Sequence, residues 1–464
     1  MELKGKKVLV VGLGKSGLAA ALFLRHRGAH VTVSDVRSAE ALAKELPALL
    51  EEGIMVETGG HGLLTFRRQD LIVVSPGVPL NTPELAQVKS FGLPVIGELE
   101  LAARFLKGKI LAITGSNGKT TTTALVGEIL DAAGLPTLVG GNIGVPVVAL
   151  IDPSTDQTWS VLEVSSFQLE STAKFHPSIA VILNITPDHL DRHGTFENYA
   201  LAKERIFASQ NENDYLVLNA DNIRAAEAAT RSSAQVYLFS LEHPVPQGAW
   251  LEDGFVVFRS ASDAPIEKIV PLAGIPLKGA HNIENVLAAV CAARLAGASA
   301  ESIRQAVENF RAVEHRLEYV ATINGVEYYN DSKATNVDAT LKAVASFNSG
   351  IHLILGGKDK GSDYTQLADL LRTRVRAVYT IGTAAAKIES QLRGVITIQS
   401  CETLDKAVNM AANAAHPGDI VLLAPACSSF DQFESYEHRG RVFKQLVSDR
   451  RGLTSAPVAV VRNN

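Results

Sequence analysis

The chain has 464 residues, of which 46% are hydrophobic and 20% charged, and its formal net charge is -5. This length predicts about three domains, and the composition is typical of a soluble globular protein without the basic bias of a nucleic-acid or lipid-surface binder. No stretch approaches the roughly 20 apolar residues of a membrane span. The three cysteines are odd in number and not spaced as a metal site, which argues against a disulfide framework and favours a cytoplasmic protein.

The N-terminal segment has the pattern of a βαβ unit. We expect strand, glycine turn, helix and strand in succession, at residues 8–11, 12–17, 17–26 and 31–34. The turn Gly12-Leu-Gly-Lys-Ser-Gly17, followed by Asp35, matches the dinucleotide-binding fingerprint. A further strand at 71–75 runs into a proline and glycine loop, where α/β folds place ligands, and we expect the segment to close near residue 94.

A phosphate-binding loop, Thr114-Gly-Ser-Asn-Gly-Lys-Thr120, follows the next apolar strand. Gly115 and Gly118 let backbone N–H groups converge on an anion, Lys119 adds a positive charge, and the Thr120 hydroxyl can reach a magnesium ion. The usual nucleotide loop has four residues between its glycines and this loop has two. The loop resembles that of the Mur ligases and folylpolyglutamate synthetases, which make amide bonds with ATP. An ordinary glycine turn between strand and helix is the alternative.

The central segment alternates strands and helices, which predicts a parallel sheet. After a helix at 121–133 and a glycine cluster at 140–144, buried-looking strands are expected at 160–164 and 179–185. Short runs between 214 and 271, among them 215–218 and 255–258, suggest an antiparallel patch. A helical stretch at 282–296 ends the segment.

Three polar features of the central segment suit chemistry. Glu163 lies inside an apolar strand, where a carboxylate needs a magnesium ion or a structural ion pair. The loop Thr186-Pro-Asp-His-Leu-Asp-Arg-His193 is either a catalytic rim or a polar surface loop, and for His193 alone the surface interpretation is preferred. Lys203 shares the apolar stripe of a helix, and the plain explanation is a lysine whose stem covers the core while its amine reaches water.

The third segment opens with a hairpin signal at Asn324-Gly325 and continues with strand-like runs at 351–355, 377–381 and 420–423. We expect a second α/β sheet here. Three loops follow strands and are candidates for ligand binding or for plain turns and helix caps: Asp331-Ser-Lys-Ala-Thr-Asn336, Gly356-Gly-Lys-Asp-Lys-Gly361 and Ala424-Pro-Ala-Cys-Ser-Ser-Phe430.

These motifs together resemble the Mur ligase family, and within it the branch that adds D-glutamate. The resemblance covers essentially the whole chain and implies an α/β protein of three domains. They are a Rossmann-like UDP-substrate domain at 1–94, a P-loop mononucleotide-binding ATPase domain at 95–312, and a Rossmann-like amino-acid-binding domain at 313–464. It implies an ATP-dependent, ADP-forming ligase that joins D-glutamate to UDP-N-acetylmuramoyl-L-alanine through an acyl phosphate, in cytoplasmic peptidoglycan precursor synthesis. The expected state is a monomer, with no nucleic acid bound.

The resemblance also assigns roles to individual residues. Catalytic roles fall to Lys119, His189, Lys203 and Arg316. ATP is expected at Gly115, Ser116, Asn117, Gly118, Lys119, Thr120, Thr121, Asn282, Asn285, Arg316 and Asp331. The UDP-substrate is expected at Ser16, Asp35, Arg37, Ser75, Gly77 and Asn142, and D-glutamate at Thr335, Lys360 (with Lys358 as the alternative), Ser429, Phe430 and Tyr436. Two magnesium ions are expected, one on Thr120 and Glu163 and one on His189 and a carbamylated Lys203.

Other functions remain open at this point. Folylpolyglutamate synthetase shares the phosphate loop, but its loop lies near the N-terminus, whereas about 110 residues precede it here. Sister Mur ligases for L-alanine or diamino acids are disfavoured by Asp331-Ser-Lys-Ala-Thr-Asn336. The glycine turn at 12–17 would also suit an NAD-dependent oxidoreductase, and a non-catalytic nucleotide switch is the third possibility.

Overall fold

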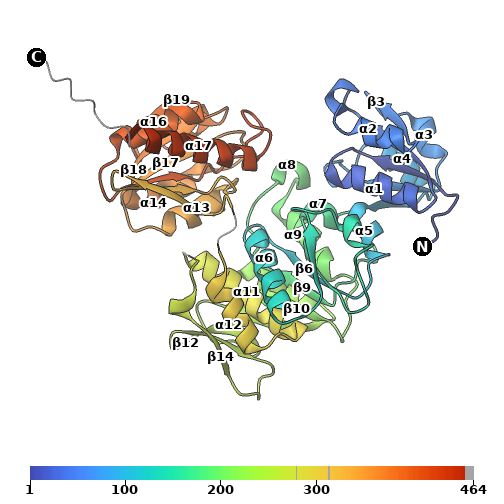
Figure 1. Cartoon of the computed structure of the whole chain (residues 1–464), viewed down its shortest axis with the longest axis horizontal. Coiled ribbons are helices and arrows are strands. Elements are labelled where there is room, and N and C mark those ends of the chain that lie inside the picture. Colours follow the sequence, from blue (N-terminus) through green and yellow to red (C-terminus); the bar gives the residue numbers. More distant parts are fainter. Residues whose placement is uncertain (278, 312–313, 455–464) are drawn as a thin grey trace, which may run out of the picture. The chain divides into compact units, whose positions relative to one another are not determined.

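The structure is a computed structural model that describes residues 1–277, 279–311 and 314–454. It divides into two compact units, which are described separately. Unit 1 comprises Met1–Pro187, Arg192–Pro276 and Glu284–Phe310; unit 2 comprises Asp188–Asp191, Leu277–Ile283 and the chain from Arg311 onward. Figure 1 colours the first sheet blue, the second from teal to yellow and the third orange to red.

The first sheet, in unit 1, is parallel throughout, with the order β3-β2-β1-β4-β5. Its strands are β1 Lys7–Val11, β2 His30–Asp35, β3 Met55–Thr58, β4 Leu71–Val74 and β5 Val95–Gly97. The accompanying helices are α1 Lys15–His26, α2 Leu46–Glu51, α3 Leu63–Arg67, α4 Pro83–Ser90 and α5 Glu98–Ala103, with a 3₁₀ helix η1 at Glu40–Leu42. Alternate residues of β1 pack into two cores, Val8 and Val10 on one face and Leu9 and Val11 on the other, as in a sheet covered on both sides.

The second sheet, also in unit 1, has the order β14-β13-β12-β11-β10-β9-β6-β8-β7 among the described residues. Its strands are β6 Lys109–Thr114, β7 Thr137–Gly141, β8 Trp159–Glu163, β9 Ile179–Ile182, β10 Tyr215–Asn219, β11 Gln235–Ser240, β12 Gly248–Glu252, β13 Phe255–Arg259 and β14 Glu267–Pro271. The helices of this segment are α6 Lys119–Ala132, α7 Ser166–Leu169, α8 Leu190–His193, α9 Phe196–Glu204, α10 Ile223–Ala226, α11 Ala280–Ala296 and α12 Ala300–Asn309. Its 3₁₀ helices are η2 Val147–Leu150, η3 Arg205–Phe207, η4 Glu227–Arg231 and η5 Leu272–Gly274.

The third sheet, in unit 2, has the order β15-β16-β20-β17-β18-β19 and is parallel except for the β15–β16 hairpin. Its strands are β15 Glu318–Ile323, β16 Val326–Asn330, β17 Ile351–Gly356, β18 Val375–Ile381, β19 Ile398–Glu402 and β20 Ile420–Leu423. The helices are α13 Val337–Ala345, α14 Ala368–Arg374, α15 Ala385–Gln391, α16 Leu404–Ala414 and α17 Tyr436–Thr454, with a 3₁₀ helix η6 at Tyr364–Leu367.

Most expected elements are confirmed, and one is wrong. The run at 215–218 lies in β10, which pairs in parallel with β9 and β11; the antiparallel patch begins only at β12 and continues through β13 and β14. Short apolar runs do not carry strand direction, because that depends on the connection between strands. The first sheet extends to Gly97, past the boundary expected at residue 94. The hairpin at Asn324-Gly325 is confirmed, with φ of 51° and 78° at the two turn residues.

All three cysteines are buried free thiols. Cys291 lies in α11 of unit 1, whereas Cys401 and Cys427 lie in unit 2. No helix in the described ranges is both long enough and apolar enough to cross a membrane.

Candidate active site

A cavity of about 390 Å³ lies where β1, β2 and β4 end, as expected for a ligand site of a parallel sheet. All six residues predicted to bind the UDP-substrate line it: Ser16, Asp35, Arg37, Ser75, Gly77 and Asn142. The glycine turn is sterically required, since a Cβ on Gly17 would lie 1.9 Å from the carbonyl oxygen of Gly12. The sequence motif therefore marks a real pocket.

Asp35 and Arg37 form one wall of this cavity. Asp35 Oδ2 accepts a hydrogen bond from the Leu13 amide at 2.7 Å. The same oxygen forms an ion pair with Arg37 Nη2 at 2.9 Å. Burial raises the pKa of Asp35, but the hydrogen bonds from Arg37 and Leu13 outweigh it and bring the pKa below its usual value. The carboxylate is therefore ionised at neutral pH and fixed in orientation before any ligand arrives.

Two residues of the second sheet's segment that the site prediction missed also reach this cavity or its wall. Gln168 lines the cavity. Arg192 pairs with Glu170 at 2.8 Å and donates to the carbonyl oxygens of Gly77 and Val78, at 3.4 and 3.2 Å. Arg192 belongs to the 186–193 loop, whose many charged residues are evident in the sequence. The sequence did not indicate that Arg192 contacts the loop at Gly77 and Val78.

The phosphate loop is braced by polar side chains from neighbouring strands and helices. The Asn184 carbonyl oxygen accepts from the Ser116 amide, and the Asn184 side chain accepts from the Asn117 amide, both at 2.9 Å. Lys119 Nζ donates to the carbonyl oxygens of Gly115 and Ser116 at 2.8 and 3.0 Å. Asn184 was missed, although a polar residue in an apolar run, here two residues beyond the end of β9, is a recognisable signal.

Asn285 of α11 packs directly against Gly118 of the phosphate loop. The φ of Gly118 is 85°, and a Cβ there would lie 2.2 Å from Asn285 Oδ1. Asn285 Oδ1 also accepts from Thr122 at 3.4 Å. Asn285 therefore lies against the phosphate loop, as predicted for a nucleotide contact, while Asn282 is a buried residue of the first turn of α11 and falls in unit 2.

Thr120 and Glu163 form the donor set expected for one magnesium ion. The Thr120 hydroxyl donates to Glu163 Oε2 at 2.8 Å, and Glu163 is 1% exposed. Asn142 donates to the other carboxylate oxygen at 2.9 Å. A buried carboxylate and a hydroxyl are hard oxygen ligands beside a phosphate loop, so these residues fit Mg²⁺. The structural ion pair that was the alternative for Glu163 is absent from the ion pairs of the described residues.

Lys203 lies beside the same loop. It is 1% exposed, and its Nζ donates to the Gly115 carbonyl oxygen at 2.7 Å and lies 4.6 Å from the ring centre of Tyr199. The alternative of a lysine whose amine reaches water is therefore wrong. As an ammonium group Lys203 would repel a cation, and it fits a metal site only after conversion to a carbamate, which supplies oxygen ligands.

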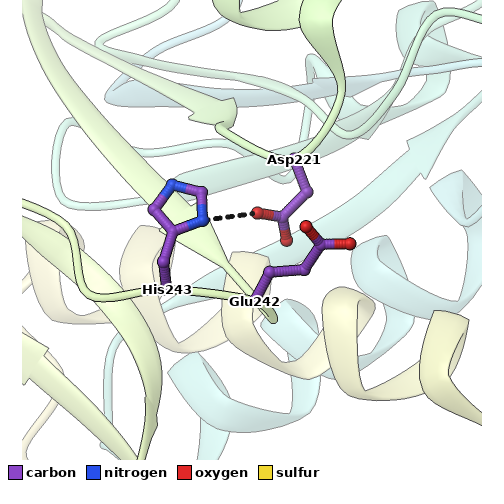
Figure 2. A group of neighbouring side chains, drawn as sticks. All are labelled: Asp221, Glu242 and His243. Atoms are coloured by element: carbon purple, nitrogen blue, oxygen red, sulfur yellow. Dashed lines mark ion pairs between the residues drawn. The ribbon is translucent and has the colours of Figure 1, made fainter.

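Neighbouring His, Asp and Glu side chains form two other groups in the described part of the chain that could hold an ion, and neither includes a predicted ligand. One is Asp221, Glu242 and His243, where His243 Nδ1 lies 3.5 Å from Asp221 (Figure 2). The carboxylate of Asp221 already accepts from Ser240 and from the Leu241 amide, at 2.5 and 2.6 Å, so its evident role is to fix this turn. The other group is Glu314, His315 and Glu318, where Lys444 pairs with both glutamates.

In unit 2, the positive charge of Arg316 acts on the buried carboxyl group of Asp331. Burial raises the pKa of Asp331 to about 6, opposed by the positive charge of Arg316 and a hydrogen bond from the Leu317 amide. His281 is affected in the opposite sense: burial lowers its pKa to about 4, helped by Lys342 and Arg316. The two residues predicted to contact the nucleotide from the third sheet therefore lie near each other.

Three loops at the ends of adjacent strands β16, β17 and β20 meet in unit 2, at residues 331–336, 356–361 and 425–436; we refer to them as the three-loop cluster. The Ala426 amide donates to the Ala334 carbonyl oxygen and the Lys358 amide to that of Ser428, both at 2.9 Å. The cluster contains the residues predicted to bind D-glutamate: Thr335, Lys360, Ser429, Phe430 and Tyr436. Ser429 is buried, and Phe430 is 68% exposed and free to meet a ligand.

Asp188 ties the start of the 188–191 segment to this cluster within unit 2. Its carboxylate lies 3.5 Å from Lys360 Nζ and accepts from Asn336 Nδ2 at 3.0 Å. Lys360 is half-buried, whereas Lys358 is exposed. His189 follows in a left-handed conformation, with φ of 52°. These contacts favour Lys360 over Lys358 as the lysine of the site.

The sequence-based prediction missed Arg439, which joins two loops of the three-loop cluster, 331–336 and 425–436. Arg439 lies in the first turn of α17 and is fully buried. It donates to the Ser332 hydroxyl and carbonyl oxygens at 2.9 and 2.8 Å, and to the carbonyl oxygens of Cys427 and Ser428 at 3.1 and 3.4 Å. Burial lowers its pKa to about 10, so it remains a cation at neutral pH.

Family models match three successive parts of the chain. They are described as "Mur ligase MurD-like, N-terminal domain" over residues 6–97, "Mur ligase middle domain" over 113–293, and "Mur ligase, glutamate ligase domain" over 315–427. The chain belongs to the Mur ligase family. The three sheets are accordingly those of the three-domain Mur ligase fold, and the glycine turn at 12–17 is no longer an argument for an oxidoreductase.

Relatives within the Mur ligase family cover nearly the whole chain. A protein of Acidobacterium capsulatum named UDP-N-acetylmuramoylalanine--D-glutamate ligase is 70% identical over 97% of this chain and 98% of its own length. One of the same name from Koribacter versatilis is 60% identical over 96% and 98%. Among solved structures, UDP-N-acetylmuramate-alanine ligase MurC from Thermotoga maritima superposes with a TM-score of 0.60 at 20% identity, over 96% of this chain and 100% of that one. The last likeness concerns the fold alone.

Proposed function

We propose that this Mur ligase adds D-glutamate to UDP-N-acetylmuramoyl-L-alanine, converting ATP to ADP and phosphate, in cytoplasmic synthesis of the peptidoglycan precursor. One observation carries the proposal: the cavity at 12–17 and the phosphate loop share Asn142, which lines the first and donates to Glu163 beside the second. This shared residue supports adjacent places in unit 1 for a nucleotide-linked substrate and ATP. The high identity to relatives named for this reaction supports the choice of D-glutamate.

The reaction begins with the terminal carboxylate of the UDP-substrate. A carboxylate oxygen attacks the γ-phosphorus of ATP, ADP leaves, and an acyl phosphate results. The phosphate-loop amides and Lys119 hold the phosphates, because converging N–H groups and a fixed cation stabilise the charge of the transferring group. Bound magnesium would supply further positive charge there, held by Thr120 and Glu163 at one site and by His189 and carbamylated Lys203 at the other.

The second half of the reaction makes the amide. The deprotonated amine of D-glutamate attacks the acyl carbon, and the tetrahedral intermediate expels phosphate as the C–O bond breaks. We assign the binding of D-glutamate to the three-loop cluster, where Lys360 faces a carboxylate of the substrate. Asp331, Arg316, Asn282 and Asn285 are assigned to the nucleotide, and the protein is proposed to act as a monomer of three domains, the first of which includes β5 and so reaches Gly97.

Magnesium-dependent phosphate release tests the proposal. The purified chain is given ATP and UDP-N-acetylmuramoyl-L-alanine, and D-glutamate, L-glutamate, L-alanine or a diamino acid is added in separate reactions. We expect release with D-glutamate alone, with a product heavier by one glutamyl residue in the mass spectrum. Release with another amino acid would keep the ligase chemistry and change the substrate; no release with any of them would overturn the proposal.

A further inference from the structure

Glu98 is a buried acid at the junction between the first sheet and the second sheet of unit 1. It is the first residue of α5, directly after β5, and is 1% exposed. Its Oε1 accepts a hydrogen bond from the Val148 amide of η2 at 2.8 Å, while no hydrogen-bond partner of Oε2 exists among the described residues. A buried carboxyl oxygen without a partner costs stability, so its retention calls for an explanation.

The segment that Glu98 holds leads directly to the active site. The segment between β7 and η2 carries Asn142, whose amide donates to the Glu163 carbonyl oxygen at 2.8 Å and whose side chain donates to the Glu163 carboxylate at 2.9 Å. The Gly141 amide closes the segment on the Val145 carbonyl oxygen at 2.8 Å. The loop is thus fixed at its start by Glu163 and at its end by Glu98.

A second glutamate on the same helix serves as a comparison. Glu100 is also buried, but its carboxylate accepts from Arg104 at 2.8 Å and from the amides of Ala173 and Lys174 at 2.8 and 2.9 Å. Glu100 is a satisfied structural ion pair that docks α5 on the second sheet's segment. Glu98 differs because no cationic side chain of the described residues pairs with it, and it holds only the backbone of η2.

We propose that Glu98 is a positioning residue of the UDP-substrate pocket, which holds η2 and thereby the loop that carries Asn142 against both the pocket and Glu163. The inference rests on the proposed function for the identity of the pocket's ligand. Glu98 touches neither substrate, and it acts through the backbone of Val148 and the placement of Asn142.

The hold of Glu98 on η2 depends on its charge. Burial raises the pKa of Glu98 to about 7, opposed by the nearby backbone amides of Val148 and Val147, and no charged side chain contributes. The elements packed against α5 carry few charges: η2, α7, β4 and β5 have none, α1 carries Lys15, Arg25 and His26, and α5 itself carries Glu100, with Arg104 directly after its last residue. The three on α1 are exposed, and Glu100 is paired with Arg104.

The sign of the effect follows from linkage. We call the arrangement in which η2 is held against Glu98 the closed arrangement, and there the pKa of Glu98 is raised. Release of η2 would expose Glu98 to water and return its pKa to the ordinary value near 4.5. The protonated acid therefore favours the closed arrangement, and ionisation favours release. The closed loop is most stable below pH 4.5, and that stability is lost as the pH rises through about 7.

Three variants separate the carboxyl group's shape from its charge. Glu98→Gln keeps an acceptor for Val148 and cannot ionise, whereas Glu98→Ala removes the acceptor. Glu128→Gln, which removes an exposed carboxylate on another helix, α6, is the control. We measure the affinity for UDP by calorimetry from pH 6 to 8.5, and amide hydrogen exchange of the 141–150 segment relative to Glu98→Gln at each pH. The KM for the UDP-substrate is measured alongside.

We expect the wild type and Glu128→Gln to lose affinity for UDP by about tenfold between pH 6 and 8.5, with a matching loss of protection at 141–150. Glu98→Gln should vary less than twofold, and Glu98→Ala should bind weakly at every pH. A wild type and Glu98→Gln with the same pH profile would overturn the inference, as would a wild type that does not bind UDP. Neither UDP binding nor exchange requires ligation, so a chain that shows this pattern without making the glutamyl product would contradict only the proposed function.

Discussion

The phosphate loop of unit 1 and the three-loop cluster of unit 2 are two proposed ligand sites that are built in different ways. The phosphate loop is one continuous segment after β6, whose glycines and Lys119 give it its chemistry. The three-loop cluster is assembled from separate segments after β16, β17 and β20, joined by hydrogen bonds between their backbones and by the buried Arg439. A contiguous site loses function when one residue changes, whereas a composite site also loses it when the group that joins its parts is removed.

The largest effect is expected at the continuous loop. Lys119→Ala should lower kcat for phosphate release by about 10³-fold, because it removes the cation that we propose for the transferring phosphates. Steady-state kinetics check this, with Lys107→Ala, an exposed lysine, as the control. The melting temperature should change little, and a Lys119→Ala variant that retains more than a tenth of wild-type kcat would contradict the assigned role.

A smaller effect is expected at Lys203, whose amine touches the same loop. Lys203→Ala should lower kcat by about 10²-fold if a carbamate there holds metal, and short carboxylates such as formate or acetate should restore part of the activity. Rates with and without added carboxylate measure this, and Lys174→Ala serves as a control because that lysine is exposed. Absence of any rescue would count against the modification.

At the composite site, the joining residue should affect stability first. Arg439→Met leaves the Ser332, Cys427 and Ser428 carbonyl oxygens without their buried donor, and we expect unfolding to become easier by about 3 kcal/mol. Denaturant titration measures it, and Arg441→Met, exposed on the same helix, is the matched control. The KM for D-glutamate should rise more than that for ATP; equal stability of the two variants would refute the joining role.

The smallest effect distinguishes two lysines of one loop. Lys360→Ala should raise the KM for D-glutamate by about tenfold, the loss of one charged contact, and leave that for ATP within twofold. Lys358→Ala should change neither by more than twofold, since that side chain is exposed and only its backbone pairs with Ser428. A larger effect from Lys358→Ala than from Lys360→Ala would reverse the assignment.

The same contrast explains what could be predicted from the sequence. The pocket at 12–17, the phosphate loop and the hairpin at Asn324-Gly325 were predictable, because each is a local pattern in which backbone conformation requires particular residues. The roles of Arg439 and Glu98 were not predictable, since an arginine or glutamate in a helix is normally expected at the surface and only tertiary packing buries these two. The parallel direction of β10 was missed for a related reason: it depends on the path of the chain between strands.

Lys203 lies between these cases. Its apolar stripe predicted burial along the helix, but the same stripe is shared by lysines that only cover a core with their stems. The hydrogen bond to Gly115 depends on α9 packing beside the phosphate loop, a contact between segments about 90 residues apart. Contacts of this kind are set by the fold, and no local sequence pattern indicates them.

The three buried thiols offer a way to watch the molecule open. Burial raises the pKa values of Cys291, Cys401 and Cys427, that of Cys427 to about 11, so at neutral pH each is a covered, protonated thiol that reacts poorly with alkylating or disulfide reagents. Modification then requires local or global unfolding that exposes the thiol, so the modification rate reports how often that unfolding occurs. Because Cys291 lies in one unit and the other two in the other, mass-resolved labelling would time the unfolding of the two units independently within one unaltered chain.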